Sequence, residues 1–308
     1  IGLTGGDAFN YQLTSTSASA SGSVTPKPLR IDGLTGVSAT DRVYDGSTVV
    51  EVTVTSTGPI APNPADVVGS DDVTVTAPAT GTTTGTMIDK HVGTAKPVAV
   101  AGLALGGADA ANYSITATSG VTVDISPKGV TAIYSAGTRV YDGSTAAAIT
   151  GSSSDLIAGD TVGIGATGVF TGSGARNVGT DKPVDVTGGA LSGVDAANYA
   201  LLNPTGSTTG SITPKSVAAS YLGGTRVYDG GTTAPVTGSA TGFIAGDAVS
   251  LTQTAVFTGA GARNVGNHKP VEISAIGLTG GDAGNYALLT SAATTTASIT
   301  PRPLRIEG

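Results

Sequence analysis

The sequence predicts an all-β chain made of small β-sandwich modules repeated in tandem. The phrase Arg-Val-Tyr-Asp-Gly occurs three times, at 42–46, 139–143 and 226–230. Short stretches rich in Thr and Val alternate with turns that contain Gly and Asp, and no stretch keeps a helical period. A chain that repeats itself this strictly is an array of copies of one unit, rather than one large domain.

A proline that precedes Lys or Arg sets the length of each copy. It stands at 26, 127, 214 and 301, so successive copies are 101, 87 and 87 residues apart. We therefore expect three complete modules. The predicted division is a tail of a preceding repeat (1–26), module 1 (27–127), module 2 (128–214), module 3 (215–301) and the start of a following repeat (302–308).

Module 1 is longer than the others mainly because of a Pro-rich insertion at 58–66. Proline fixes φ and donates no backbone hydrogen bond, so this segment is predicted to be a stiff loop and not a central strand. It is also the feature that most distinguishes one module from the rest. Its residues are therefore our candidates for ligand binding: Pro59, Pro62, Asn63, Pro64 and Asp66.

The elements of one module follow from module 2. Residues Asp142–Gly143 and Gly159–Asp160 read as turns, because Gly supplies a positive φ and Asp bonds neighbouring amides. Seven or so strands separated by such turns are typical of a β-sandwich. The stretches with strand composition are 130–134, 138–141, 145–150, 161–164, 168–171, 182–187, 199–202 and 210–213.

The segment Asp-Ala-x-Asn-Tyr refines the predicted fold. Asp195 and Tyr199 stand at i and i+4, the spacing of the tyrosine corner of immunoglobulin-like domains, where the Tyr hydroxyl bonds back to the backbone. The same spacing occurs at Asp109/Tyr113 and Asp282/Tyr286. We predict immunoglobulin-like modules. The Cys-Trp-Cys core of antibody domains is absent, so a β-grasp-like module stays the alternative.

Composition excludes several classes of function. The net charge of −7 repels phosphate backbones and anionic lipid, so we expect no nucleic-acid binding. No window has the 18 or more strongly apolar residues that a membrane-spanning helix needs, so we expect no membrane insertion. The chain has no Cys, which excludes thiol catalysis and Cys-ligated zinc. The two histidines, His91 and His268, occupy different positions in their modules, which argues against a repeated histidine site. We predict that the chain is not an enzyme.

The recurring residues are interpreted as architecture, because a residue fixed in every copy of a scaffold more often holds shape than contacts a ligand. This set is Tyr44, Tyr141, Tyr228, Asp109, Tyr113, Asp195, Tyr199, Asp282 and Tyr286. We expect no cofactor. The alternative is a calcium ion at the module junctions, because calcium binds carboxylate oxygens. Its candidate ligands are Asp45, Asp142, Asp229, Asp72, Asp160 and Asp247.

The chain resembles the YDG repeat domains of filamentous-haemagglutinin-like bacterial adhesins, which are exported by two-partner secretion. The matching residues are Arg-Val-Tyr-Asp-Gly, Arg-Asn-Val-Gly at 176–179 and 263–266, Lys-Pro-Val, and Gly-x-Asp-Ala-x-Asn-Tyr. Module 1 departs from the pattern, with Lys90-His91-Val92-Gly93 in place of Arg-Asn-Val-Gly. The resemblance brings no catalytic residues.

The resemblance implies the stalk region of a large adhesin, secreted or anchored on the bacterial surface, that extends a binding tip for cell adhesion or biofilm formation. Short proline linkers favour a stiff, monomeric rod. The alternative is that the modules themselves bind a glycan or a surface or matrix protein.

Overall fold

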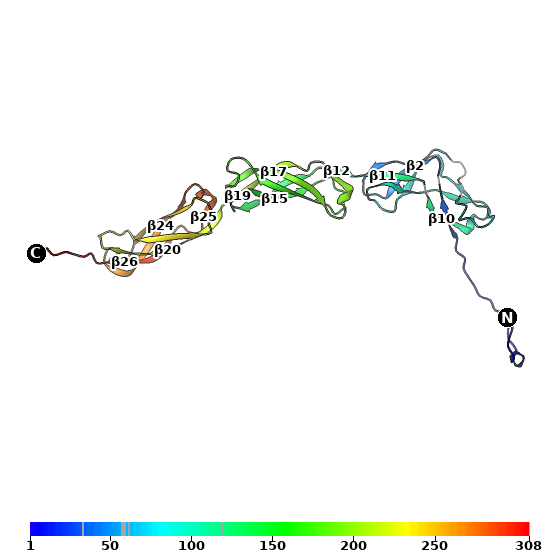
Figure 1. The fold of residues 1–308 in the computed structure, drawn as a ribbon, viewed down its shortest axis with the longest axis horizontal. Helices are drawn as coiled ribbons and strands as arrows, with labels where there is room; N and C mark the ends of the chain where they lie inside the picture. The colour runs from blue at the N-terminus through cyan, green and yellow to red at the C-terminus, as the bar shows by residue number, and fades with distance from the viewer. Residues whose placement is uncertain (33, 57–59, 61, 119, 308) are drawn as a thin grey trace. The chain divides into compact units, whose positions relative to one another are not determined.

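The computed structural model describes residues 1–32, 34–56, 60, 62–118 and 120–307. It divides into two compact units, Ile1–Lys128 and Gly129–Gly308. All regular elements of the described residues are β-strands or single-turn 3-10 helices (Figure 1). The all-β prediction is therefore confirmed, and no α-helix among these residues covers a sheet as a β-grasp module would require. Of the part of the chain described, no helix is long and apolar enough to cross a bilayer.

The first unit contains module 1. Residues 1–26 form one 3-10 turn, η1 (Ala8–Asn10), and no strand. In module 1 the first strand runs parallel to the tenth, and the eleventh pairs with both the third and the seventh. The elements are β1 (Lys27–Ile31), β2 (Val37–Ala39), β3 (Arg42–Val43), β4 (Val49–Val54), β5 (Thr74–Thr76), β6 (Gly81–Thr86), β7 (Gly93–Pro97), β8 (Ala99–Val100), β9 (Ala104–Gly106), η2 (Ala110–Asn112), β10 (Tyr113–Thr118) and β11 (Thr122–Ser126).

The second unit contains modules 2 and 3. The elements of module 2 are β12 (Lys128–Val130), β13 (Ile133–Ala136), β14 (Thr138–Val140), β15 (Ala146–Ser152), β16 (Gly163–Phe170), β17 (Gly179–Ser192), η3 (Ala196–Asn198), β18 (Tyr199–Leu201) and β19 (Gly206–Thr213). Those of module 3 are β20 (Lys215–Gly223), β21 (Thr225–Val227), β22 (Val236–Thr241), β23 (Ser250–Phe257), β24 (Gly266–Thr279), η4 (Ala283–Asn285), β25 (Tyr286–Leu288) and β26 (Ala293–Thr300).

The strand order of module 2 shows how one sheet becomes a sandwich. Six strands pair in the order β13-β15-β16-β17-β19-β14. Only Gly137 separates β13 from β14, yet these two strands lie at opposite edges of that order. The sheet must therefore fold over on itself, and β13 packs against β19. The last strand, β19, runs parallel to β14.

Module 3 repeats these pairings except one: β22 and β23, the counterparts of β15 and β16, belong to separate sheets. Its first strand, β20, combines the roles of β12 and β13: it runs antiparallel to β22 and parallel to β25. Similarly, β21 runs parallel to β26, and β24 pairs with both β23 and β26. Two successive modules of the second unit therefore share most of their strand pairings, as expected for copies of one unit.

Alternation along the longest strand places the core. Val184 and Val186 of β17 are fully buried, whereas Asp185 between them is exposed, as the sequence pattern predicts. Val184 packs with Phe170 of β16 and Ile212 of β19, and Val186 packs with Tyr134 of β13 and Ile164 of β16. Aliphatic and aromatic side chains from both layers form the core, and the chain has no disulfide.

The strand boundaries correct the sequence analysis in three places. The stretch 130–134 is divided between β12, which ends at Val130, and β13, which begins at Ile133. The stretches 161–164 and 168–171 form one strand, β16, and 182–187 is only the centre of the 14-residue β17. The register of β16 against β17 shifts between Gly165 and Thr167, so an irregularity is absorbed inside the ladder instead of ending the strand. Gly-rich composition hid this continuity, because the pairing with β17 overrides local propensity.

Candidate functional site: the junction between modules 2 and 3

The tyrosine corner of each module binds a carboxylate as well as the backbone. In module 3 the Tyr286 hydroxyl accepts a hydrogen bond from the Ile244 N–H at 2.8 Å and donates one to Oδ2 of Asp247 at 2.6 Å. The other modules repeat this pattern. The corresponding sets are Tyr199 with Ile157 (3.0 Å) and Asp160 (2.6 Å), and Tyr113 with Val68 (2.8 Å) and Asp71 (2.6 Å).

The structure corrects one candidate residue. The recurring Asp of the turns is Asp160 in module 2 and Asp247 in module 3, and its counterpart in module 1 is Asp71 and not Asp72, because Asp71 accepts the tyrosine hydrogen bond. Asp72 instead offers its backbone N–H to the Asp109 carboxylate at 2.9 Å. The long insertion before this turn made the register ambiguous by one residue in the sequence.

The corner aspartates brace the same turn. Oδ2 of Asp282 accepts the N–H of Ala248 at 3.0 Å, and Oδ2 of Asp195 accepts the N–H of Thr161 at 2.8 Å. Each precedes a 3-10 helix, yet its side chain makes no capping hydrogen bond to that helix. The carboxylate therefore connects the corner to the turn that carries the buried Asp, and so shapes the end of the module.

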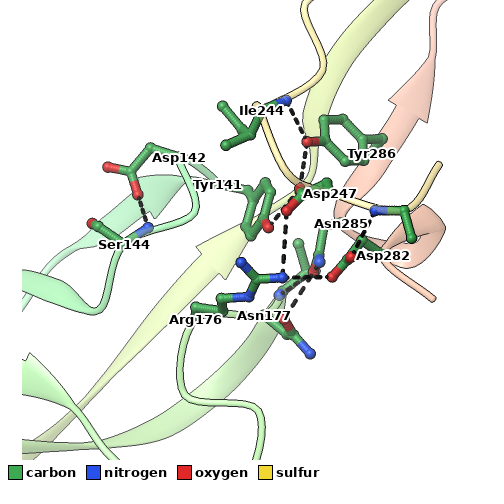
Figure 2. A network of polar contacts seen from close by, with 12 residues as sticks. Tyr141, Asp142, Ser144, Arg176, Asn177, Ile244, Asp247, Asp282, Asn285 and Tyr286 are labelled. Carbon is green, nitrogen blue, oxygen red and sulfur yellow. Dashed lines mark hydrogen bonds and ion pairs between the residues drawn. The ribbon is translucent and has the colours of Figure 1, made fainter.

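At the junction, a tyrosine from module 2 joins the corner of module 3 (Figure 2). The Tyr141 hydroxyl, from the Arg-Val-Tyr-Asp-Gly phrase, donates to Oδ2 of Asp247 at 2.7 Å. Its ring meets the ring of Tyr286 edge to face, with centroids 5.5 Å apart. The Asp247 side chain is fully buried. One carboxylate oxygen thus receives two phenol hydrogen bonds, one from each module.

Arg176 supplies the balancing positive charge. Its Nη2 lies 2.9 Å from Oδ1 of Asp282 and 3.3 Å from Oδ1 of Asp247 (Figure 2). Among the described residues, this Asp247 oxygen makes no hydrogen bond of good geometry, so the ion pair is its compensation. The guanidinium is partly exposed, while the carboxylate it faces is not. A buried carboxylate needs such a partner, because burial of an unpaired charge is costly.

An asparagine closes the polar network. Oδ1 of Asn285 accepts the Val178 N–H at 2.9 Å, and its Nδ2 lies 3.4 Å from Oδ1 of Asn177. Asn285 is 4 % exposed. The loop Arg-Asn-Val-Gly of module 2 therefore contacts module 3 through both its side chains and its backbone.

Apolar packing surrounds these contacts. Tyr141, Phe170 and Ile212 of module 2 belong to one buried cluster with Val217 and Tyr286 of module 3. Ile244 of module 3 lies close to Gly143 of module 2. A Cβ added to Gly143 would be 3.1 Å from Cγ2 of Ile244. Gly143 is also in the left-handed region, with φ of 80°. The glycine of the Arg-Val-Tyr-Asp-Gly phrase therefore has two roles: it adopts the positive φ of the turn, and its lack of a side chain lets module 3 approach closely.

The buried groups of the junction have shifted pKa values. Burial raises the pKa of Asp247, but the hydrogen bonds from Tyr286 and Tyr141 and the charge of Arg176 outweigh burial and hold it below the ordinary 3.8. Burial, and then the hydrogen bond to Asp247, raises the pKa of Tyr141 to about 12. The pKa of Tyr286 is raised for the same two reasons.

These shifts predict a window of pH in which the junction holds. A carboxylate with a lowered pKa stabilises the junction above pH 3.8, and this contribution is lost as pH falls through the still lower pKa of the folded state. A tyrosine with a raised pKa stabilises it below pH 10, and this is lost as pH rises through about 12. Spin labels on Ser154→Cys and Ser291→Cys, both exposed, should give one narrow distance distribution inside the window and broad ones outside.

The matched control for the alkaline limit is Tyr141→Phe, which cannot ionise. In this variant the spin-label distance distribution should broaden less at alkaline pH. The acid pH at which the distribution broadens should be the same as in the wild type. An unchanged alkaline limit in this variant would show that another group sets it.

The aspartates of the repeated phrase are already paired. Asp142 forms an ion pair with Arg139 and accepts the Ser144 N–H at 2.8 Å. Asp45 does the same with Arg42 and Ser47, and Asp229 with Arg226 and Gly231. The arginines also stack, Arg139 on Phe170 and Arg226 on Phe257, each at 5.5 Å from the ring centroid.

We therefore predict that chelation leaves the chain unchanged. Asp160 and Asp247 bind tyrosine hydroxyls, and the described residues contain no cluster of three or more His, Asp or Glu able to hold a metal. The melting temperature measured by calorimetry should be the same with excess chelator and with added calcium. A higher melting temperature with added calcium would instead support a calcium ion at the module junction.

The Pro-rich insertion is fixed to the first strand of its module. Asp66 makes a two-pronged contact with Arg30, at 2.9 and 3.1 Å, and also accepts the Arg30 N–H at 3.0 Å. The Asn63 amide donates to Asp32 at 2.5 Å. Pro62 and Pro64 lie beside them, and Pro59 lies outside the described residues. The polar groups proposed for ligand binding therefore hold the loop to its own module.

A cross-link between Lys182 and Asn198, which the residue types alone would allow, is not supported by their positions. Lys182 is near the start of β17 and its Nζ donates to the Gly174 carbonyl at 2.9 Å. Asn198 follows the far end of that strand. Ten residues of extended chain separate Lys182 from that end, which is roughly 30 Å.

Sequence reasoning missed the residues that join the modules. Arg176 and Asn177 were noted only as part of a recurring motif, and nothing in the sequence paired them with Asp247, Asp282 or Asn285, more than 60 residues away. Their signal was recurrence itself, since Arg-Asn-Val-Gly appears again at 263–266.

Comparison with known structures gives weak likenesses. A crystal structure of the I9-I11 tandem from titin has 10 % identity, covers 87 % of this chain and 98 % of its own, and has a TM-score of 0.20. A three-Ig structure of an E-to-A variant of titin domains I67-I69 has 9 % identity, covers 91 % and 100 %, and has a TM-score of 0.18. Such low scores support no conclusion, so the fold assignment rests on the strand order. No curated protein matches the chain.

The family comparison covers most of the chain. The YDG domain matches three times, at residues 25–120, 126–209 and 213–297. Each match contains one Arg-Val-Tyr-Asp-Gly phrase and one tyrosine corner, the two features that meet at the junction. The chain therefore belongs to the YDG domain family, and its three domains are tandem copies of that unit.

Proposed function

We propose that the chain is a spacer from the stalk of a bacterial adhesin, secreted or held at the cell surface, that carries a binding tip for cell adhesion or biofilm formation. The observation that carries this proposal is the junction of modules 2 and 3, where the recurring Tyr, Arg, Asp and Asn side chains contact the neighbouring module. At this junction, residues that recur along the chain hold module 2 against module 3. The bacterial setting and the export route rest on the resemblance to adhesin repeats.

The chemistry of the junction supports a mechanical role. Two phenol hydrogen bonds to one buried carboxylate, together with an arginine between two aspartates, restrict both the position and the rotation of one module against the other. Hydrogen bonds to charged groups contribute about 1.5–3 kcal/mol each, more than neutral ones. A spacer needs this kind of stiffness, and we propose that the chain has no catalytic activity.

Binding of a glycan or a matrix protein by the modules is the second candidate. It finds less support, because Asn63 and Asp66 of the insertion contact Asp32 and Arg30 of the same module. A pair of experiments separates the two functions. Deletion of one module from the displayed parent protein should shorten its reach and reduce adhesion. The purified chain should give no signal on a glycan array, whereas a signal that deletion of 58–66 abolishes would favour the second function.

A further inference from the structure

The Arg and Val of the Arg-Val-Tyr-Asp-Gly phrase belong to a strand that holds the last strand of the same module. In module 2, β14 runs parallel to β19 over three residue pairs, the last of which is Val140 opposite Thr213. The Tyr141 N–H donates to the Thr213 carbonyl at 2.9 Å, and the Thr213 hydroxyl donates to the Arg139 carbonyl at 3.2 Å. We call this pairing of β14 with β19, including the Tyr141 contact, the parallel clamp.

The same contacts recur in the other two modules, where β21 runs parallel to β26 and β3 runs parallel to β11. In each module the partner of the phrase is the hydroxyl residue that directly precedes the final Pro. It accepts the Tyr N–H and donates its hydroxyl to the Arg carbonyl. The groups are Tyr228 (2.9 Å) and Arg226 (3.3 Å) with Thr300, and Tyr44 (2.9 Å) and Arg42 (3.4 Å) with Ser126.

The inner face of the clamp is closed to water. The side chains of Tyr141 and Ile212 lie in the core and are 1 % and 2 % exposed, and Arg139 stacks on Phe170. The hydrogen bonds of the clamp therefore meet little competition from water on this side. The alternation of the strand places Val140 on the outer face, which explains why this apolar side chain is 55 % exposed.

The parallel direction decides how the clamp meets tension along the chain. The chain leaves module 2 through β19, so tension pulls this strand toward its C-terminal end. The same tension pulls β14, through the residues that precede it, toward its N-terminal end. Because the two strands are parallel, these pulls oppose each other along the strand axis, and the three pairs are sheared together. The first strands of modules 1 and 3, β1 and β20, also run parallel to their partners β10 and β25.

We infer that the parallel clamp is the element of each module that resists tension, and that the Arg-Val-Tyr of the phrase is its fixed half. The junction limits bending between modules 2 and 3, whereas the clamp keeps a single module from being pulled open. The inference rests on the proposed spacer function for its biological meaning, because a spacer transmits any force that acts on the tip. Its tests involve no adhesion, so the clamp can fail while the spacer role stands, and the module-deletion assay can fail while the clamp stands.

Pulling one protein in two directions tests the clamp. The chain has no Cys, so a variant with Val140→Cys and Thr213→Cys, both exposed positions, offers one pair of handles for single-molecule force spectroscopy under reducing conditions. Pulling through the chain ends shears the clamp of module 2, whereas pulling through the two cysteines peels it one pair at a time. The unfolding force should be roughly threefold lower in the second direction, because three pairs no longer share the load. Equal forces in both directions would overturn the inference.

A matched pair of substitutions locates the resistance. Thr213→Val removes the hydroxyl bond of the clamp, and Thr167→Val removes an equivalent bond to the Thr187 carbonyl, at 3.0 Å, between β16 and β17. Both threonines are exposed, and the two variants should change the calorimetric melting temperature equally.

Under constant force applied through the chain ends, Thr213→Val should make one of the two 87-residue unfolding steps about fivefold faster, the factor expected for one lost hydrogen bond. The other 87-residue step, from module 3, should keep its wild-type rate, and Thr167→Val should change neither step. An unchanged rate in Thr213→Val, or an equal change in both variants, would refute the clamp.

Discussion

Replacing Asp247 by Ala should destabilise module 3 by about 3 kcal/mol and free it from module 2. The change leaves two buried phenol hydroxyls, those of Tyr141 and Tyr286, without an acceptor, and each such loss costs about 1–3 kcal/mol. Hydrogen exchange of β24 and β26, followed by mass spectrometry, reads the stability of module 3 separately from the other modules. The spin-label distance distribution between modules 2 and 3 should broaden in the same variant.

Asp71→Ala in module 1 is the matched control. Asp71 accepts the Tyr113 hydroxyl, so its removal leaves one phenol without an acceptor and should cost about half as much. Asp247→Asn keeps an oxygen for both tyrosines but loses the charge that faces Arg176, and should fall between the wild type and Asp247→Ala. Equal losses at positions 247 and 71 would show that the contact with module 2 contributes nothing to stability.

Replacing Gly280 by Ala should be at least as damaging, with a loss on the order of 3 kcal/mol or more. Gly280 has φ of 116°, and a Cβ there would lie 2.1 Å from the Ala248 carbonyl oxygen. Backbone strain of this kind costs about 1–3 kcal/mol, and the clash with main chain adds to it. The carbonyl cannot retreat without breaking its hydrogen bond from the Asp282 N–H, at 3.2 Å.

The neighbouring glycine provides the control for this prediction. A Cβ on Gly281 would meet nothing within 4 Å, so Gly281→Ala should leave the calorimetric melting temperature unchanged or slightly raised. Gly193 and Gly107 have the same strained geometry as Gly280, with Cβ positions 2.3 and 2.2 Å from a carbonyl oxygen. Alanine there should be equally harmful in modules 2 and 1. A mild effect at all three positions would show that the turn can relax.

The first glycine of Gly-x-Asp-Ala-x-Asn-Tyr thus has a physical explanation that its recurrence alone could not provide. The motif combines a glycine whose conformation would strain any other residue, an Asp that braces a turn, an Asn that is buried where modules 2 and 3 meet, and a Tyr. This Tyr reaches a carboxylate 39 residues earlier in the chain in modules 2 and 3, and 42 residues earlier in module 1. The sequence revealed that these residues belong together. The atoms they contact lie in other segments, so the contacts needed the folded chain.

The sequence by itself determined that the chain is a tandem array of β modules. A repeated phrase and an alternation of apolar and polar residues lie along the chain and can be recognised without the fold. It could not determine that Arg176 meets Asp282, 106 residues away, or that Asp71 takes the position assigned to Asp72. Those contacts depend on how the end of one fold fits the next and on the register of an insertion. Only the tertiary structure decides them, because shape complementarity between module ends is not encoded in any local pattern.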